Sequence, residues 1–105
     1  MMRSMVELAK VIRTKNSGPF ILTIDIIFKE KEVYEKLKNM DYFSKNFWAN
    51  LYGLKGSDVI SVIYFDPVCA VKANIKRKVP SGSPGDSDVY GAQQHAPLLE
   101  VKIDV

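Results

Sequence analysis

Apolar and polar residues alternate along several stretches of the chain, and a period of two residues predicts β-strands. The clearest alternation covers Phe20–Phe28, and the next covers Val71–Ile75, where lysine and asparagine fill the intervening positions. Weaker alternation predicts a first strand within Met5–Ile12 and a last strand over Leu99–Val105. Val59–Phe65 has almost no polar face, which is typical of a strand in the centre of a sheet.

Two helices are predicted between the second and third of these strands. Val33, Leu37 and Met40 fall at helical spacing after Glu30, which predicts a short first helix. Ser44 suits the N-cap of a second helix, and Gly53 suits the left-handed residue that follows its last turn. The aromatic face of this second helix, formed by Phe47, Trp48 and Tyr52, is expected to pack on the sheet rather than to stack on a ligand.

This order of elements predicts an α+β fold. We expect a ferredoxin-like two-layer sandwich with about five mainly antiparallel strands, two helices on one face, and a long polar loop before the last strand. In such a fold the strand–helix–strand unit leaves a gap between its two parallel strands, which another strand fills. A chain of 105 residues suits a single domain over 1–105.

Charge is unevenly distributed along the chain. Met1–Val79 carries 14 lysines and arginines against 8 acids, whereas Pro80–Val105 carries 1 against 4. No apolar run is long enough to span a membrane, and the start lacks the apolar segment of a signal peptide, so we expect a cytoplasmic protein without membrane contact. The single cysteine, Cys69, is expected in the core.

The segment Pro80–Pro97 contains almost nothing that could build a core. A connection longer than about 12 to 15 residues without secondary structure is usually functional or disordered. One interpretation is an Ω-like loop that packs over the open face of the sheet. The other is an oxyanion cradle, because the amides and hydroxyls of Ser81–Gly85 can hold a phosphate or carboxylate.

The turn expected at Arg13–Gly18 offers cationic donors for an anion. Because the long loop carries acids and the body is basic, we expect the two to meet in one composite polar site. Neither a metal nor a cofactor is expected, since Asp86, Asp88 and His95 match no ligand spacing. The candidate ligand-binding residues are Arg13, Lys15, Asn16, Gly18, Ser81, Gly82, Gly85, Asp86, Asp88, Tyr90, Gln93, Gln94 and His95.

The motifs AKVIRTKNSGPF, DIIF, LYG, FDP and SGSPGDSDVYGAQQHAPLLEVKI make the chain recognisable. It resembles a small family of about this length, a domain of unknown function found beside or fused to proteins of the acyclic terpene utilisation (AtuA) type. It is also similar to the C-terminal ferredoxin-fold domain of AtuA-type proteins, whose cationic turn Arg13, Lys15 and Gly18 match by type. The resemblance implies an AtuA-like partner and a setting in catabolism.

Three functions remain open at this stage. The first is an accessory or small-ligand-binding subunit that acts with an AtuA-like partner on organic acids or acyl thioesters, with a small anionic or acyl ligand. The second is a free-standing enzyme in which Arg13 and Lys15 hold a carboxylate or phosphate while Asp86, Asp88 or His95 moves protons. The third and least favoured is nucleic-acid binding through Lys72, Lys76, Arg77 and Lys78. Open sheet edges also favour a homo-oligomer.

Overall fold

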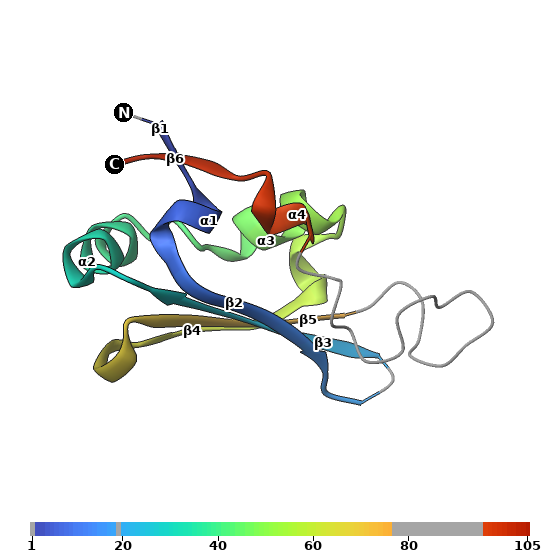
Figure 1. Ribbon diagram of the computed structural model, residues 1–105. Helices are drawn as coiled ribbons and strands as arrows, with labels where there is room; N and C mark the ends of the chain where they lie inside the picture. Colours follow the sequence, from blue (N-terminus) through green and yellow to red (C-terminus); the bar gives the residue numbers. More distant parts are fainter. Residues whose placement is uncertain (1, 19, 77–95) are drawn as a thin grey trace.

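The computed structural model describes residues 2–18, 20–76 and 96–105 (Figure 1). The expected α+β class is confirmed, with six strands and four α-helices in these ranges. In chain order the elements are β1 (Met2–Ser4), α1 (Met5–Leu8), β2 (Ala9–Asn16), β3 (Ile21–Phe28), α2 (Lys31–Asn39), α3 (Lys45–Tyr52), β4 (Val59–Phe65), β5 (Ala70–Lys76), α4 (Ala96–Leu99) and β6 (Lys102–Asp104).

The main sheet has four strands in the order β2-β3-β5-β4, and all neighbouring strands are antiparallel. Strands β3 and β4 therefore run parallel, with α2 and α3 connecting them and β5 filling the gap. This split strand–helix–strand unit was expected, and it is compatible with a ferredoxin-like sandwich. The helices lie on one side of the sheet, above it in Figure 1.

Two expectations about strand position are wrong. Val59–Phe65 forms the edge strand β4 rather than a central strand. The last strand is short and pairs with β1 in a separate two-stranded sheet, with Arg3 opposite Ile103, so it does not extend the main sheet. Leu98 and Leu99 belong to α4 instead of this strand, and the Leu98 side chain is fully buried in the core.

The first predicted strand, within Met5–Ile12, is also partly wrong, because Met5–Leu8 forms the short helix α1. The Ser4 hydroxyl accepts a hydrogen bond of 3.2 Å from the Glu7 amide and so caps this turn. Met5 and Leu8 are buried at helical spacing. The strand begins only at Ala9, where it pairs with β3.

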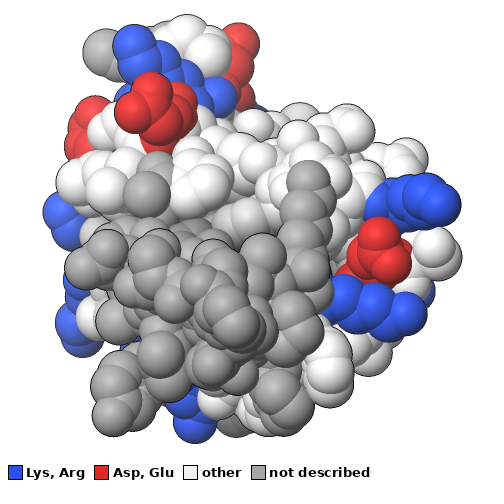
Figure 2. Space-filling model, turned by 90° about the vertical axis from the view of Figure 1, so that its right-hand side faces the viewer, with Lys and Arg blue, Asp and Glu red and all other residues white. Residues whose placement is uncertain are grey.

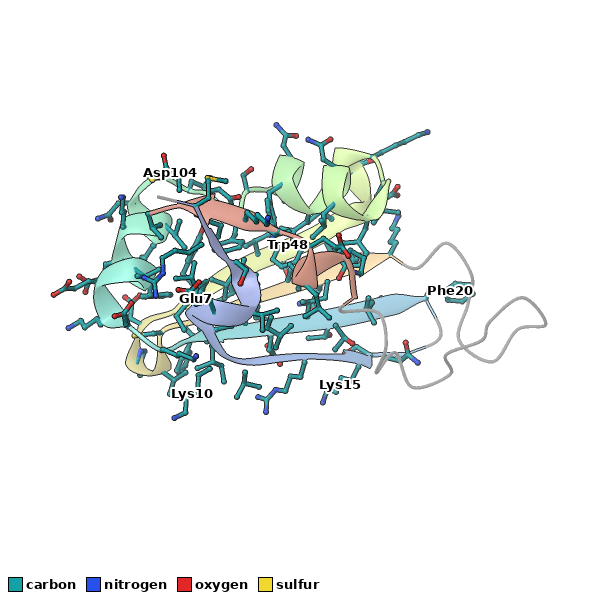
Figure 3. All side chains as sticks on the ribbon, turned by 45° about the horizontal axis from the view of Figure 1, so that its top comes forward. Glu7, Lys10, Lys15, Phe20, Trp48 and Asp104 are labelled. Atoms are coloured by element: carbon teal, nitrogen blue, oxygen red, sulfur yellow. The ribbon has the colours of Figure 1, made fainter. Side chains whose placement is uncertain are left out.

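Helix α3, the second of the two predicted helices, begins and ends at the residues that the sequence predicts. The Ser44 hydroxyl caps α3, and Gly53 adopts φ 65° just after its last turn. Trp48 is fully buried, and its ring lies 6.0 Å from that of Phe43 between ring centroids. Figure 3 places Trp48 between the helices and the sheet, so this aromatic face belongs to the core.

Helix α2 buries most of the expected apolar face, since Leu37 is buried and Val33 packs against the core, but not all of it. Tyr34 and Leu37 are buried, whereas Met40, which helical spacing assigned to the apolar face, is mostly exposed. Cys69 is only half-buried and follows the tight turn between β4 and β5, where φ is 53°, although it does pack against the core. The core therefore contains Tyr34, whereas Met40 lies outside it.

No helix in the described ranges is long and apolar enough to cross a membrane.

Candidate binding surface

The face of the four-stranded sheet turned away from the helices, here called the outer face, carries both charged and apolar side chains. Strand pairing aligns Arg13, Asp25, Lys72 and Ile63 in one row across β2, β3, β5 and β4. Nε of Arg13 donates a hydrogen bond of 3.3 Å to Oδ2 of Asp25. Asp25 therefore lies between two cations, and its carboxylate partly neutralises them.

An apolar hollow of about 370 Å³ adjoins this charged row. Its apolar lining includes Ile63 and Phe65, each 50% exposed, and Val68, which is 52% exposed. A cluster of large, half-exposed apolar side chains is a common sign of an interaction site. The full lining is Arg13, Asp25, Ile27, Ile63, Phe65, Val68, Ala70 and Lys72.

A row of hydrogen-bonded polar side chains crosses the outer face next to the charged row. The Thr23 hydroxyl donates to Oδ1 of Asn74 at 2.6 Å, so the Ser17 hydroxyl is left as the donor in its 2.7 Å contact with Thr23. Nδ2 of Asn74 donates to the Ser61 hydroxyl at 2.9 Å. This row of hydrogen bonds fixes the relative position of β3, β5 and β4 and stiffens the surface beside the hollow.

The predicted site residues are found in two groups. Arg13, Lys15 and Asn16 belong to strand β2, which corrects the expectation of a turn, because pairing with β3 continues as far as Asn16. Lys15 points away from the helices in Figure 3, and strand alternation puts Arg13, two residues earlier in β2, on the same face. Gly18 lies in the tight turn after β2 with φ 99°. The predicted residues Ser81, Gly82, Gly85, Asp86, Asp88, Tyr90, Gln93, Gln94 and His95 lie outside the described residues.

The outer face has an excess of positive charge. Arg13, Lys15, Lys72 and Lys76 share this side through the alternation of β2 and β5, where Asp25 is the one carboxylate among the described strand residues of this face. Figure 2 shows lysine and arginine side chains at the left and lower margins, where no acidic side chain is in view, and mixed basic and acidic side chains at the top and right. This excess of positive charge favours an acidic ligand or partner at the sheet.

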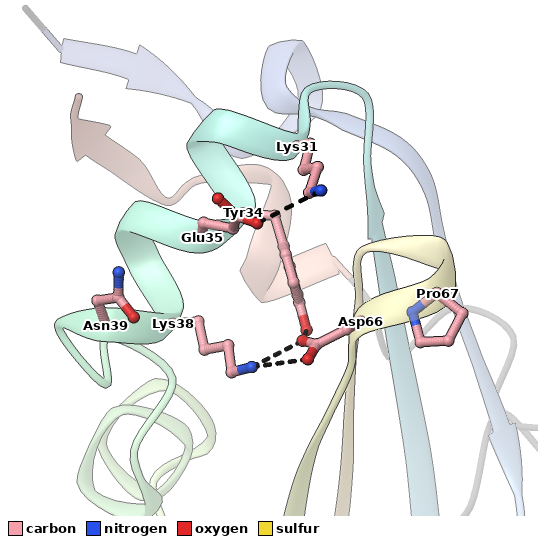
Figure 4. Close-up of a pocket in the computed structure, with 7 residues that line it drawn as sticks. All are labelled: Lys31, Tyr34, Glu35, Lys38, Asn39, Asp66 and Pro67. Carbon is pink, nitrogen blue, oxygen red and sulfur yellow. Dashed lines mark hydrogen bonds and ion pairs between the residues drawn. The ribbon is translucent and has the colours of Figure 1, made fainter.

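A second hollow, of about 500 Å³, lies between helix α2 and the β4–β5 turn (Figure 4). The hydroxyl of Tyr34 donates to Oδ1 of Asp66 at 2.6 Å, and Nζ of Lys38 reaches the two carboxylate oxygens at 2.8 and 2.9 Å. Lys31 and Glu35 form an ion pair at its rim, 3.8 Å apart. Because these groups already bind one another, this cluster holds α2 on the turn.

Two protonation equilibria in this cluster are displaced. Burial, together with the hydrogen bond to Asp66, raises the pKa of Tyr34 well above that of a free phenol. The hydrogen bond from Lys38, followed by that from Tyr34, lowers the pKa of the Asp66 carboxyl. Near neutral pH the acceptor is therefore the carboxylate and the donor is the neutral phenol, which strengthens their hydrogen bond.

The sequence hypothesis missed the apolar part of the outer face. The expectation of a central strand covered Ile63 and Phe65 but not Val68, and all three are half-exposed because the described helices cover only the other face of the sheet. The one sequence signal of an exposed sheet face was the alternation of β5, which separates a core side from a basic side. Among the described residues, no three histidine, cysteine, aspartate or glutamate side chains gather as metal ligands.

In the part of the chain that the structure describes, fold and surface define a small α+β domain with one sheet face covered by helices and one basic face that no described helix covers. A family model described as Domain of unknown function (DUF4387) matches residues 5–102, and the chain belongs to this family. No curated protein and no solved structure matches the chain.

Proposed function

We propose that this chain is an accessory subunit that binds a partner protein through the outer face of its sheet. The observation that carries the proposal is the hollow between Ile63, Phe65 and Val68, which combines half-exposed apolar side chains with a cationic rim. Burying an exposed apolar side chain against a partner contributes about 25 cal/mol per Å² of area removed from water. The apolar centre supplies binding energy, and the charged rim selects the partner.

The partner that this face favours presents carboxylates around an apolar side chain. Arg13 and Lys72 flank the hollow and are available to acidic groups, although Asp25 attracts both. The resemblance of the loop motif to AtuA-associated chains supports an AtuA-like protein as that partner. The pathway setting would then be catabolism of organic acids or acyl thioesters.

A small anionic or acyl ligand is the second candidate for the same hollow. Its acyl part would lie against Phe65 and Val68, with its carboxylate at Arg13 or Lys72. A catalytic role lacks support from the described residues, because the candidate proton-transfer groups Asp86, Asp88 and His95 lie outside them. Nucleic acid is less favoured, because among the described residues Phe65 is the only exposed aromatic ring that lines the hollow, whereas stacking sites use several.

Co-purification tests the proposal. The tagged chain, expressed in its native host, is expected to recover an AtuA-like protein that mass spectrometry identifies. Val68→Asp is expected to reduce that recovery at least tenfold, because it puts a carboxylate into the apolar hollow. Val6→Asp is the matched control, since Val6 is 53% exposed but lies on α1, on the helix side. Recovery of no AtuA-like chain, or equal loss in both variants, would refute the proposal.

A further inference from the structure

The free edge of β4 lacks the usual protection against pairing with another strand. All seven residues of the strand, VISVIYF, are uncharged, and none is proline. Among the described residues no strand pairs with its outer edge. Ile60, Ile63 and Phe65 are 44%, 50% and 50% exposed, so apolar side chains border this row of backbone groups. An edge strand of this kind is a template for pairing with another chain.

The opposite edge of the same sheet is protected. Strand β2 carries Lys10, Arg13 and Lys15 among its eight residues, and charged edge strands repel further strands. A bulge between Val59 and Ser61 does disturb β4, but only at its beginning, and pairing with β5 is regular from Ser61 to Phe65. The contrast between the two edges indicates that β4 is the edge that binds a strand.

We infer that a second copy of this chain pairs with β4, antiparallel to it and about a two-fold axis at Ile63. This inference is independent of the proposed function. An uncharged strand meets its own copy without electrostatic repulsion, and antiparallel pairing of identical strands is self-complementary. An axis at Val62 would put Asp58 directly opposite Asp66 of the second copy, whereas an axis at Ile63 separates these two acids.

Such pairing joins two four-stranded sheets into one sheet of eight strands, whose remaining edges are the two charged β2 strands. The axis is perpendicular to the sheet, so both outer faces lie on the same side and the two hollows, each lined by Ile63 and Phe65, become neighbours. The Lys72 side chains would start about 14 Å apart, three strand spacings of about 4.8 Å. Salt screens charges at that distance, since the Debye length is about 10 Å at 0.1 M.

Charged substitutions at Ile63, one of each sign, test both the dimer and its axis. Sedimentation equilibrium of the wild type is expected to give the mass of two chains at micromolar concentration. Ile63→Lys and Ile63→Glu should each be monomeric, because identical charges then meet across the axis whatever their sign. An equimolar mixture of the two variants should regain the mass of a dimer. Val11→Lys, on the charged β2 edge, is the control and should remain dimeric.

Circular dichroism melting of each variant checks that the fold is retained, which the half-exposed position of Ile63 favours. A wild type that sediments as a monomer up to about millimolar concentration overturns the inference. A dimer that persists in both Ile63 variants, or that Val11→Lys dissociates, overturns β4 as the interface. Two folded monomeric variants that fail to associate when mixed overturn the axis at Ile63.

Discussion

The hydroxyl of Tyr34 donates a hydrogen bond of 2.6 Å to the carboxylate of Asp66, across 32 positions of sequence. Tyr34 is 2% exposed, so its ring is part of the core while its oxygen reaches the surface hollow. The contact fixes α2 to the turn that separates β4 from β5. That turn also supplies Val68 to the outer face, so the same contact positions one side of the proposed docking site.

Tyr34→Phe tests the strength of this link. The variant keeps the buried ring and removes one hydrogen bond to a charged acceptor, so we expect a loss of about 1–2 kcal/mol in the free energy of unfolding. Urea denaturation followed by circular dichroism measures the loss. Tyr42→Phe is the control and should change stability by less than about 0.5 kcal/mol, since it removes a phenol oxygen from a partly buried ring of the same aromatic cluster. Equal losses in the two variants would contradict the special role of Tyr34.

Acid should weaken the contribution of Asp66. Its folded-state pKa is lowered, chiefly by Lys38, so its stabilising effect is complete above the unfolded-state pKa of about 4 and disappears as the pH falls through the folded-state value. We therefore expect Asp66→Asn to have a lower melting temperature than the wild type at pH 7. The gap should stay constant down to about pH 5 and close below about pH 4. A gap that is unchanged at low pH would show that the carboxylate charge is irrelevant, and Lys38→Met should shrink the gap at pH 7.

The end of α3 depends on one glycine. Gly53 has φ 65°, where a side chain crowds its own backbone, so Gly53→Ala should cost about 1 kcal/mol of stability. Gly56→Ala is the matched control, because Gly56 has an ordinary φ and a Cβ there would meet open space. Chemical denaturation of both variants distinguishes them. A Gly53→Ala protein as stable as Gly56→Ala would contradict the left-handed conformation at the helix end.

Sequence reasoning predicted the features that depend on nearby residues. The N-cap at Ser44 and the left-handed Gly53 follow from side-chain and backbone chemistry within one helix, and the α+β class follows from the order of the periods. Helix α1 was missed because four residues give too little periodicity, although Ser4 and the spacing of Met5 and Leu8 carried a signal.

The remaining features depend on pairing between distant segments. An uncharged strand has the same pattern at the centre of a sheet and at an unprotected edge, so the sequence could not assign β4 to the edge. Arg13 and Lys15 were proposed as ligand-binding residues, but their neighbours Lys72 and Ile63 come from β5 and β4 through strand order alone. The contact of Tyr34 with Asp66 likewise had no sequence signal.

The basic rim should accelerate partner association. Lys72→Glu reverses a charge beside the hollow, so the association rate constant with an acidic partner should fall several-fold at low salt, and the difference should shrink as salt rises. Lys45→Glu changes the same charge on α3, away from the outer face, and should have little effect. Stopped-flow or surface plasmon resonance kinetics at two salt concentrations measure both. A salt-independent effect of Lys72→Glu would contradict electrostatic steering.

Hydroxyl-radical footprinting of the complex with the AtuA-like partner tests the central claim, docking on the outer face, most directly. Phe65 on the outer face and Met40 at the end of α2 are 50% and 59% exposed, so both should oxidise readily in the free chain. In the complex, mass spectrometry should find Phe65 protected at least threefold and Met40 oxidised as before. Protection of Met40 with Phe65 still reactive would place the partner on the helix side and contradict docking on the sheet.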